Sequence, residues 1–323
     1  MKPTALVFGC TGQDGSYLCK SLLMKGFRVI GTSRRRNPIS KRLNALEIKD
    51  EIHLISCDLQ NCEQIKTIIN TYQPIEIYNL SAQSSVGISF KEPAITHKSI
   101  VNTTLNILES CREISFKGNI FFAGSSEIFG STNKPADLRS DIDLRSPYAT
   151  AKYQSFLITK MYRDVYKLNC VTGILFNHES PLRDDRFVIK KIINKSLQIK
   201  NGLNEKLVLG DINIKRDWGY AEEFIEAIQL INRSESNKDY IVCTGESNSL
   251  KIIVEKIFQF LGLNWKNHIK ISKDLYRSNE IENSCGDPSE LYNDLGWKAE
   301  MKIDELIQTL ISYELKNNTL KNN

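Results

Sequence analysis

A glycine-rich turn near the start of the chain constrains the fold more than any other feature of the sequence. Residues 5–8 form a short apolar run, and Gly9, Gly12 and Gly15 follow it in the spacing G-x-x-G-x-x-G, where a helical pattern begins. Glycines between a strand and a helix let the backbone approach a pyrophosphate, and the helix N-terminus attracts its negative charge. The turn therefore predicts a dinucleotide site, with an ordinary glycine turn as the plain alternative.

Strand and helix patterns alternate over the first half of the chain. Strands separated by helical segments predict βαβ units, a parallel sheet and right-handed crossovers. We therefore expect an α/β protein with a Rossmann-like doubly wound parallel sheet over residues 1–176. Further apolar runs typical of strands lie at residues 28–32, 52–56, 76–80, 119–123 and 171–176, and helical spacing lies at 64–72, 95–114 and 147–166.

The pattern changes after residue 176, where the alternation weakens and charged loops become more frequent. We expect residues 177–323 to form mainly a smaller C-terminal α/β lobe that binds the substrate, with some segments crossing back to the sheet. Such a lobe closes over the carboxyl edge of the strands, where folds of this kind bind their ligands.

The composition is that of an ordinary globular protein. Of 323 residues, 41% are apolar and 25% charged, enough to bury a core without a metal or a disulfide. The net charge of +5 is dispersed along the chain and does not indicate nucleic-acid binding. No segment approaches the roughly 20 apolar residues that cross a bilayer. The eight cysteines form no C-x-x-C pair, so we predict a cytoplasmic protein with free thiols, no metal and no membrane partner.

Basic residues follow the second predicted strand, at the point that separates NAD from NADP enzymes. An acid there binds the ribose hydroxyls of NAD, but this chain has Arg34, Arg35 and Arg36 instead. Guanidinium groups bind a 2′-phosphate bidentately, so the sequence predicts NADP, with a solvated basic loop as the alternative. Asp58, after the third strand, is placed to meet the adenine, or else is a surface-turn aspartate.

A tyrosine and a lysine lie at the start of the helical pattern at 147–166. Tyr148 and Lys152 form Y-x-x-x-K, so both side chains lie on one face of the helix, and Pro147 suits its first turn. A nearby ammonium lowers the pKa of a phenol, which suits the tyrosine to act as a base. The motif is common by chance, but after a dinucleotide turn it indicates a short-chain dehydrogenase.

The strand before this helix ends in Ser125 and Glu127. A hydroxyl at this point joins the tyrosine in binding a reacting sugar oxygen. A carboxylate two residues later adds a second acid/base group, which removal of a carbon-bound proton and loss of water require. A capping or surface role is the alternative for Glu127. We predict four catalytic residues: Ser125, Glu127, Tyr148 and Lys152.

The predicted cofactor contacts share the carboxyl ends of the first four strands and the catalytic helix. They are Gly9, Thr11, Gly12, Gln13, Asp14, Gly15, Arg34, Arg35, Asp58, Leu59, Leu80, Tyr148 and Lys152.

Six stretches carry a resemblance that covers nearly the whole chain. They are T-G-Q-D-G-S-Y at 11–17, N-L-S-A-Q-S at 79–84, R-S-P-Y-A at 145–149, G-I-L-F-N-H-E-S-P at 173–181, K-R-D-W-G at 215–219 and G-D-P at 286–288. In them the sequence resembles the GDP-mannose 4,6-dehydratase family of extended short-chain dehydrogenases, within the epimerase/dehydratase superfamily.

The resemblance implies a redox-neutral reaction on GDP-mannose with bound NADP. Tyr148, assisted by Lys152, takes the C4 hydroxyl proton while hydride passes from C4 to the cofactor. Glu127 then removes the C5 proton and helps to expel the C6 hydroxyl as water, after which hydride returns to C6. The implied product is GDP-4-keto-6-deoxymannose. Ser125 stands where the family usually has threonine, and both supply a hydroxyl.

The resemblance also implies the substrate contacts, and it marks where this chain departs from the family. Ser85 replaces a histidine, Leu182 an arginine and Asp184-Asp185 a glycine-acid pair, while the loop after Arg36 is short. The implied contacts are Ser84, Asn177 near the diphosphate, Val188 and Lys191 at the nucleotide, Arg216 at a phosphate, and Arg277 with Glu280 at the ribose. Singly, each of these charges is equally explained by a surface position, and His178 and Trp218 are interpreted as structural.

Three alternatives remain open from the sequence. The first is the same reaction on another GDP-sugar, such as a GDP-heptose or an N-acetylhexosamine. The second is a sugar-nucleotide epimerase or reductase, against which Glu127 argues. The third is a non-enzymatic cofactor sensor, against which the four intact catalytic residues argue. The resemblance further implies a homodimer or homotetramer, paired through the helices at 95–114 and 147–166.

Overall fold

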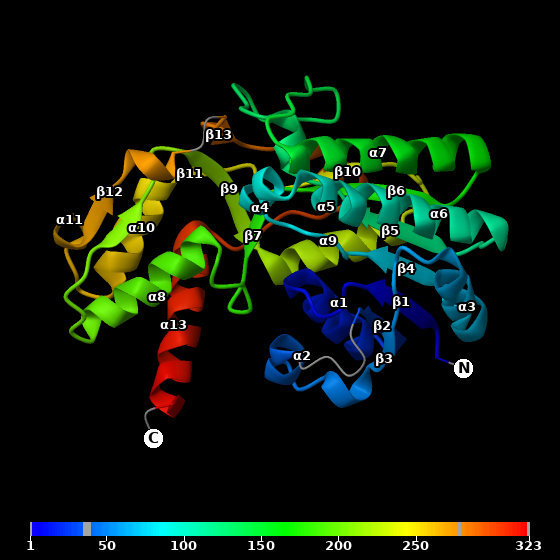
Figure 1. Ribbon diagram of the computed structural model, residues 1–323, viewed down its shortest axis with the longest axis horizontal. Coiled ribbons are helices and arrows are strands. Elements are labelled where there is room, and N and C mark those ends of the chain that lie inside the picture. Colours follow the sequence, from blue (N-terminus) through cyan, green and yellow to red (C-terminus); the bar gives the residue numbers. More distant parts are fainter. Residues whose placement is uncertain (1, 35–39, 277–278, 322–323) are drawn as a thin grey trace.

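A seven-stranded parallel β-sheet forms the centre of the larger lobe (Figure 1). The structure is a computed structural model in which residues 2–34, 40–276 and 279–321 are described, with side chains up to residue 317. The strand order is β10-β6-β5-β4-β1-β2-β3 and all neighbours are parallel, which confirms the predicted Rossmann-like sheet. The strands are β1 (Thr4–Phe8), β2 (Arg28–Ser33), β3 (His53–Ser56), β4 (Glu76–Asn79), β5 (Asn119–Ala123), β6 (Cys170–Leu175) and β10 (Tyr240–Val242).

Helices cover both faces of this sheet because its strands are apolar on both sides. In β1, Ala5 and Val7 pack into one core with α1 (Gln13–Met24) and α9 (Ala221–Arg233). Leu6 and Phe8 point to the other face and pack with α3 (Cys62–Tyr72), α6 (Thr103–Glu113) and α7 (Pro147–Tyr166). Continuous burial of a strand on both faces is typical of a parallel sheet.

The helix predicted over 95–114 differs from a regular α-helix. It is composed of α5 (Pro93–His97), a π-helical turn η2 (Lys98–Asn102) and α6. Within the π-turn, the carbonyl of Ile100 accepts hydrogen bonds from the hydroxyls of Thr104, at 2.8 Å, and Ser155 on α7, at 3.4 Å. Side-chain hydroxyls that compete for a helix carbonyl disturb the regular i to i−4 ladder, and apolar periodicity does not reveal this.

The short elements of the larger lobe lie near the carboxyl ends of its strands or join its helices. They are α2 (Lys41–Ala45), η1 (Lys49–Glu51), α4 (Val86–Lys91), η3 (Ser126–Phe129) and α12 (Ser289–Leu295).

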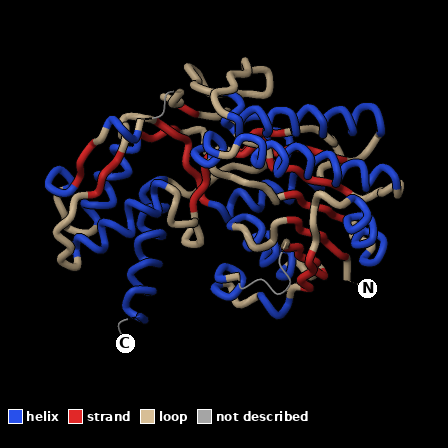
Figure 2. Tube along the Cα trace, in the orientation of Figure 1, coloured by secondary structure: helices blue, strands red, loops and turns tan. Residues whose placement is uncertain are grey.

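A smaller lobe contains short strands and its own helical core. Figure 2 shows these strands apart from the central sheet. Its helices α8 (Val188–Lys200), α10 (Leu250–Phe260) and α13 (Ile303–Lys321) bury isoleucine and leucine against one another. The remaining elements are β7 (Asn177–Glu179), β8 (Leu207–Leu209), β9 (Lys215–Tyr220), β11 (Ser247–Ser249), α11 (Trp265–His268), β12 (Ile269–Ile271), η4 (Lys273–Leu275) and β13 (Asn283–Ser284).

The chain crosses between the lobes more than once. After entering the smaller lobe it returns to place α9 against α1 and to add β10 beside β6, at the edge of the central sheet. It then re-enters the smaller lobe at β11. It returns once more to place α12 against β10, so the larger lobe is built from three separate stretches of sequence.

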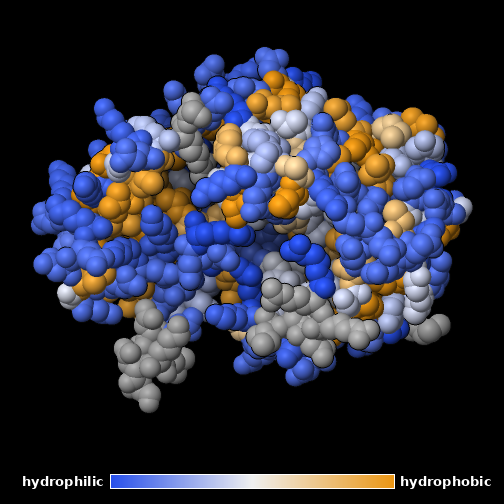
Figure 3. All heavy atoms as spheres, in the orientation of Figure 1, coloured by the Kyte–Doolittle hydropathy of each residue, from blue (hydrophilic) through white to orange (hydrophobic). Residues whose placement is uncertain are grey.

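Exposed apolar side chains gather along α7. Leu157, Met161 and Val165 repeat at intervals of four residues and are 45%, 39% and 63% exposed. Figure 3 shows orange, hydrophobic residues interspersed with blue ones in this part of the surface. Within the described residues, no helix is long and apolar enough to span a membrane.

A buried ion pair fastens α7 to the sheet, and it gives a stability prediction. The guanidinium of Arg163 donates to both carboxylate oxygens of Asp239, at 2.8 and 2.6 Å, and Asp239 also accepts the Thr172 N–H at 2.7 Å. Arg163→Met leaves a buried carboxylate without its partner, so we expect a loss of about 3–5 kcal/mol. Thermal or urea unfolding measures it. In the control Lys298→Met, at a residue whose side chain is 58% exposed, we expect a change within roughly 0.5 kcal/mol. Equal losses in both variants would contradict the prediction.

Candidate active site

The glycine turn after β1 leaves no room for side chains at two of its glycines. Gly9 has φ +84°, and a Cβ there would lie 2.7 Å from the carbonyl oxygen of Leu80. A Cβ on Gly15 would collide with the carbonyl of Gly9. Gly12 is the N-cap of α1 and has no side chain to cover the first helical N–H groups. This bare helix N-terminus fits a pyrophosphate, as predicted.

The side chains of Gln13 and Asp14 reach from the first turn of α1 to β7 and the residue that follows it. Asp14 lies 3.1 Å from Nε2 of His178, and the Gln13 amide accepts the Ser180 hydroxyl at 2.8 Å. Burial alone raises the pKa of Asp14, but the charge and hydrogen bond of His178 hold it below its usual range. Although burial opposes this, Asp14 raises the pKa of His178. His178 therefore contacts the glycine turn through Asp14, which is compatible with the structural role expected for it.

The other predicted cofactor residues lie at the carboxyl ends of neighbouring strands. Arg34 directly follows β2, Asp58 and Leu59 follow β3, and Leu80 follows β4. Asp58 is exposed, and its carboxylate accepts the N–H of Gln60 at 3.0 Å. Arg35 and Arg36, which also carried the NADP prediction, lie outside the described residues.

Ser125, Glu127 and Tyr148 come together where β5 ends and α7 begins. Ser146 caps α7 by accepting the N–H of Ala149 at 3.0 Å, and Pro147 occupies its first turn, so the tyrosine lies one residue inside the helix. Burial raises the pKa of Tyr148 to about 12, against a hydrogen bond from Ser125 that lowers it, while the charge of Glu127 raises it further. Glu127 therefore lies close enough to the phenol for its charge to influence the pKa of Tyr148.

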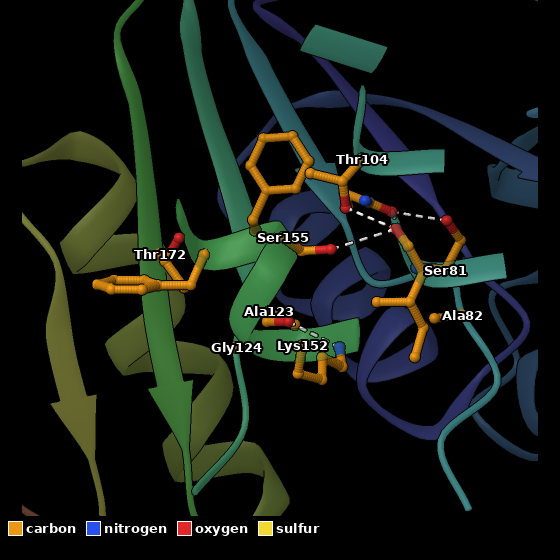
Figure 4. A pocket seen from close by; sticks show the side chains of 12 residues that line it. Ser81, Ala82, Thr104, Ala123, Gly124, Lys152, Ser155 and Thr172 are labelled. Carbon is orange, nitrogen blue, oxygen red and sulfur yellow. Dashed lines mark hydrogen bonds between the residues drawn. The ribbon is translucent and has the colours of Figure 1, made fainter. Parts of the chain in front are cut away.

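The pKa of Tyr148 is raised by burial, whereas we expected from the Y-x-x-x-K spacing that it would be lowered. The Nζ of Lys152 donates to the carbonyl of Ala123 at 2.7 Å (Figure 4) and lies 5.7 Å from the Tyr148 ring centroid. Burial lowers the pKa of Lys152 to about 8. The helix places the two residues on one face, but desolvation outweighs the attraction between them. Lys152 also lines a cavity of about 10 Å³, room for at most one water.

Of the predicted substrate residues that the structure describes, all but Ser84 belong to the smaller lobe. Asn177 begins β7 and Val188 begins α8. Lys191, one turn further, is exposed and its Nζ lies 3.4 Å from the carbonyl of Val208. Ser84 is exposed in the loop after β4, on the side of the larger lobe.

Arg216 and Glu280, predicted to bind different parts of the nucleotide, form an ion pair with each other. Nη2 of Arg216 lies 2.9 Å from the Glu280 carboxylate, and Nη1 donates to the carbonyl of Ile281 at 2.7 Å. Arg145, just before the catalytic helix, donates to the Glu280 carbonyl at 3.1 Å. This links the nucleotide side of the site to the start of α7. Arg277, the expected partner of Glu280, lies outside the described residues.

Arg183 is a further charge at the site that the sequence interpretation missed. It lies 3.3 Å from the buried Glu179 carboxylate, and its charge acts on Tyr148 and Asp14. Its place two residues after the Ser-Pro of the most specific motif was the available signal. In the described part of the chain, no three histidine, cysteine, aspartate or glutamate side chains are grouped to hold a metal ion.

Comparison with known proteins gives relatives over almost the whole chain. Residues 6–310 match the family described as GDP-mannose 4,6 dehydratase. The chain is 39% identical to GDP-mannose 4,6 dehydratase 1 of Arabidopsis thaliana, over 97% of this chain and 90% of that protein. It is 34% identical to GDP-mannose 4,6 dehydratase of Homo sapiens, over 97% and 91%.

Solved structures agree on the fold. A dTDP-glucose 4,6-dehydratase from Streptomyces venezuelae, with NAD bound, is 18% identical with a TM-score of 0.87, covering 98% of each chain. UDP-glucose 4-epimerase of Thermotoga maritima is 20% identical with a TM-score of 0.87, covering 98% of this chain and 99% of that one. Identities this low show the fold alone. The family match and the Arabidopsis and human relatives go further, and on them this chain belongs to the GDP-mannose 4,6-dehydratase family.

Proposed function

We propose that this chain is an NADP-dependent hydro-lyase that converts GDP-mannose into GDP-4-keto-6-deoxymannose. The observation that carries the proposal is the cluster of Ser125, Glu127 and Tyr148 at the end of β5, next to the glycine turn. A reductase or epimerase has no use for a second acid/base group beside the tyrosine, whereas an elimination of water requires one.

The cofactor residues fit a dinucleotide phosphate. The backbone cradle of Gly9, Gly12 and Gly15 would hold the pyrophosphate, and Arg34 after β2 supports a 2′-phosphate in place of a hydroxyl. When bound, NADP supplies the acceptor and later the donor of the hydride. Everything else in the reaction falls to the protein side chains.

Tyr148 is the base for the C4 hydroxyl, and the chain prepares it in two ways. The Ser125 hydroxyl, which lowers the pKa of Tyr148, binds the reacting oxygen together with the phenol. To accept the C4 hydroxyl proton, Tyr148 must be a phenolate, and the charge of a protonated Lys152 would stabilise that phenolate. Because burial raises the pKa of the free phenol to about 12, the phenolate needs this stabilisation before the proton is transferred to it.

Glu127 carries the proton from C5 to the departing C6 hydroxyl. A ketone at C4 acidifies C5, so a carboxylate of ordinary basicity suffices to remove that proton. The same carboxyl, now protonated, donates to the C6 oxygen as it leaves as water. Its negative charge raises the pKa of Tyr148. When Glu127 takes up the C5 proton, its charge no longer raises the pKa of Tyr148. The two proton transfers are therefore coupled.

The smaller lobe holds the nucleotide part of the substrate. Arg216 and Lys191 supply positive charge for the diphosphate and nucleotide, and Glu280 suits paired ribose hydroxyls. Since Arg216 and Glu280 are ion-paired, binding would exchange that contact for contacts with the ligand. Asn177 and Val188, at the starts of β7 and α8, complete this side.

The apolar stripe of Leu157, Met161 and Val165 on α7 supports a homodimer. Together with Leu105 on α6, which is 40% exposed, it gives two helices that would pair with the same two helices of a second copy. Sedimentation velocity on Val165→Asp, compared with the wild type, tests this pairing.

The reaction is tested by incubating the purified protein with GDP-mannose and no added reductant. We expect a product lighter by one water, with no net change in NADP(H), by mass and absorbance. If GDP-mannose gives no product but another GDP-sugar is dehydrated, the proposed substrate is wrong and the proposed reaction still holds. Failure on all GDP-sugars by protein that holds NADP would contradict a dehydratase.

Substitutions of Tyr148 and Glu127 are expected to block different steps of the reaction. Tyr148→Phe removes the base for the C4 hydroxyl, so no oxidation should occur at C4. Glu127→Gln keeps that step and lacks the C5 base, so transient reduction of bound nicotinamide should appear without loss of water. Stopped-flow absorbance and product mass separate the two, and we expect turnover to fall by at least roughly 100-fold in each. Full turnover in Glu127→Gln would remove Glu127 from the mechanism.

The pH dependence of kcat/KM is expected to show the titration of Lys152. Burial lowers the pKa of Lys152 to about 8, so its positive charge is present below that pH and is lost above it. Tyr148, with a pKa of about 12, titrates too far away to produce the same limb. We therefore expect kcat/KM to fall as pH rises through about 8. Lys152→Arg, which keeps its charge, should lose this limb, whatever its remaining rate. A limb that persists unchanged in that variant belongs to another group.

A further inference from the structure

Residues 181–187 lie between β7 and α8, two elements of the smaller lobe, and they run beside the glycine turn, since Arg42 contacts both. We call them the connecting segment. Arg183, within it, acts electrostatically on Tyr148 and on Asp14 of the turn. The connecting segment therefore borders both the catalytic tyrosine and the cofactor cradle.

Arg42 ties the connecting segment to the glycine turn from the side of the larger lobe. Its Nε donates to the carbonyl of Leu182 at 2.8 Å, and Nη1 donates to the carbonyl of Thr11 at 3.3 Å. Nη2 lies 3.6 Å from the carboxylate of Asp184. One guanidinium thus contacts the turn and two points of the connecting segment. A planar group with several fixed donors suits such a bridge better than an ammonium.

Arg42 is held firmly enough to act as an anchor. It lies on α2, where Leu43 is fully buried and Ser40 caps the helix by accepting the Leu43 N–H at 3.2 Å. The Arg42 side chain is itself only 27% exposed. Its contacts are therefore made from a fixed base in the core of the larger lobe.

The smaller lobe holds the start of the same segment. Lys190 of α8 donates to the carbonyl of Pro181 at 2.8 Å and is ion-paired with Glu314 of α13. The exposed fractions of these two side chains are 10% and 14%. The connecting segment is therefore fastened to both lobes, and Arg42 provides its link to the cofactor side.

We propose that Arg42 is a positioning residue that keeps the connecting segment closed over the glycine turn and so retains the dinucleotide through the catalytic cycle. This rests on the proposed function, in which the hydride removed from C4 must return to C6 of the same sugar. A cofactor that left between these steps would strand the intermediate. Leu182 and Asp184, which Arg42 contacts, are also positions where this sequence departs from the family pattern.

The test is the dissociation rate of NADPH from the full-length protein, followed by fluorescence after displacement with excess NADP. In Arg42→Met we expect dissociation about tenfold faster, the change that follows from losing one charge-assisted hydrogen bond. Asp184→Asn, at a residue whose side chain is 44% exposed, should change the rate in the same direction by less. The double variant should show less than the sum of both effects, because the residues are in contact. Lys41→Met, at an exposed residue on the same helix, is the control.

Two comparisons decide the result. Arg42→Lys, which retains the charge but not the planar fork, should restore only part of the retention. An Arg42→Met rate within twofold of wild type, or an equal change in Lys41→Met, would overturn the role of Arg42. Measuring wild-type turnover of GDP-mannose in the same preparations distinguishes failure of the Arg42 role from failure of the proposed function. With turnover intact, unchanged dissociation removes only the role of Arg42, whereas no wild-type turnover contradicts the proposed function and this role with it.

Discussion

The close approach of Gly9 to Leu80 is the contact on which the site depends. It brings the turn after β1 against the end of β4 at main-chain distance, where a Cβ on Gly9 would lie 2.7 Å from the Leu80 oxygen. Gly15 in turn packs against the Gly9 carbonyl, which sets the angle at which α1 leaves the sheet. Gln13 and Asp14 then face Ser180 and His178. One backbone contact thus fixes the cofactor cradle and the approach of the substrate lobe.

Burial dominates the electrostatics of the catalytic groups. It raises the pKa of Tyr148 and lowers that of Lys152 to about 8, so burial opposes the charged form of both groups, although Lys152 keeps its charge below that pH. Charges in a region shielded from water interact strongly, so the Lys152 charge would act strongly on a phenolate at Tyr148. The Asp14–His178 pair is different, since proximity there outweighs burial and favours the charged form of both groups.

The sequence interpretation succeeded where a local pattern decides the structure. The sheet, the helix at 147–166 and the assembly of Ser125, Glu127 and Tyr148 follow from apolar runs, caps and motif spacing. It was wrong about the direction of the Tyr148 pKa, because spacing along a helix says nothing about desolvation. It also missed the π-turn and the contacts of His178 with Asp14 and of Arg183 with the catalytic side, which join segments far apart in the chain. Such contacts leave no periodic signal in one sequence.

The return of the chain from the smaller lobe to the central sheet bears on how the protein is made. The edge strand β10 is synthesised well after β6, the strand beside which it lies, and much of the smaller lobe emerges from the ribosome between them. Until then β6 has an unpaired edge, and α9 has not yet covered its face of the sheet. An open strand edge of this kind invites pairing with other chains. The lobes therefore cannot be exchanged as modules by a cut at residue 176, and the nascent chain is most exposed to aggregation just before its sheet closes.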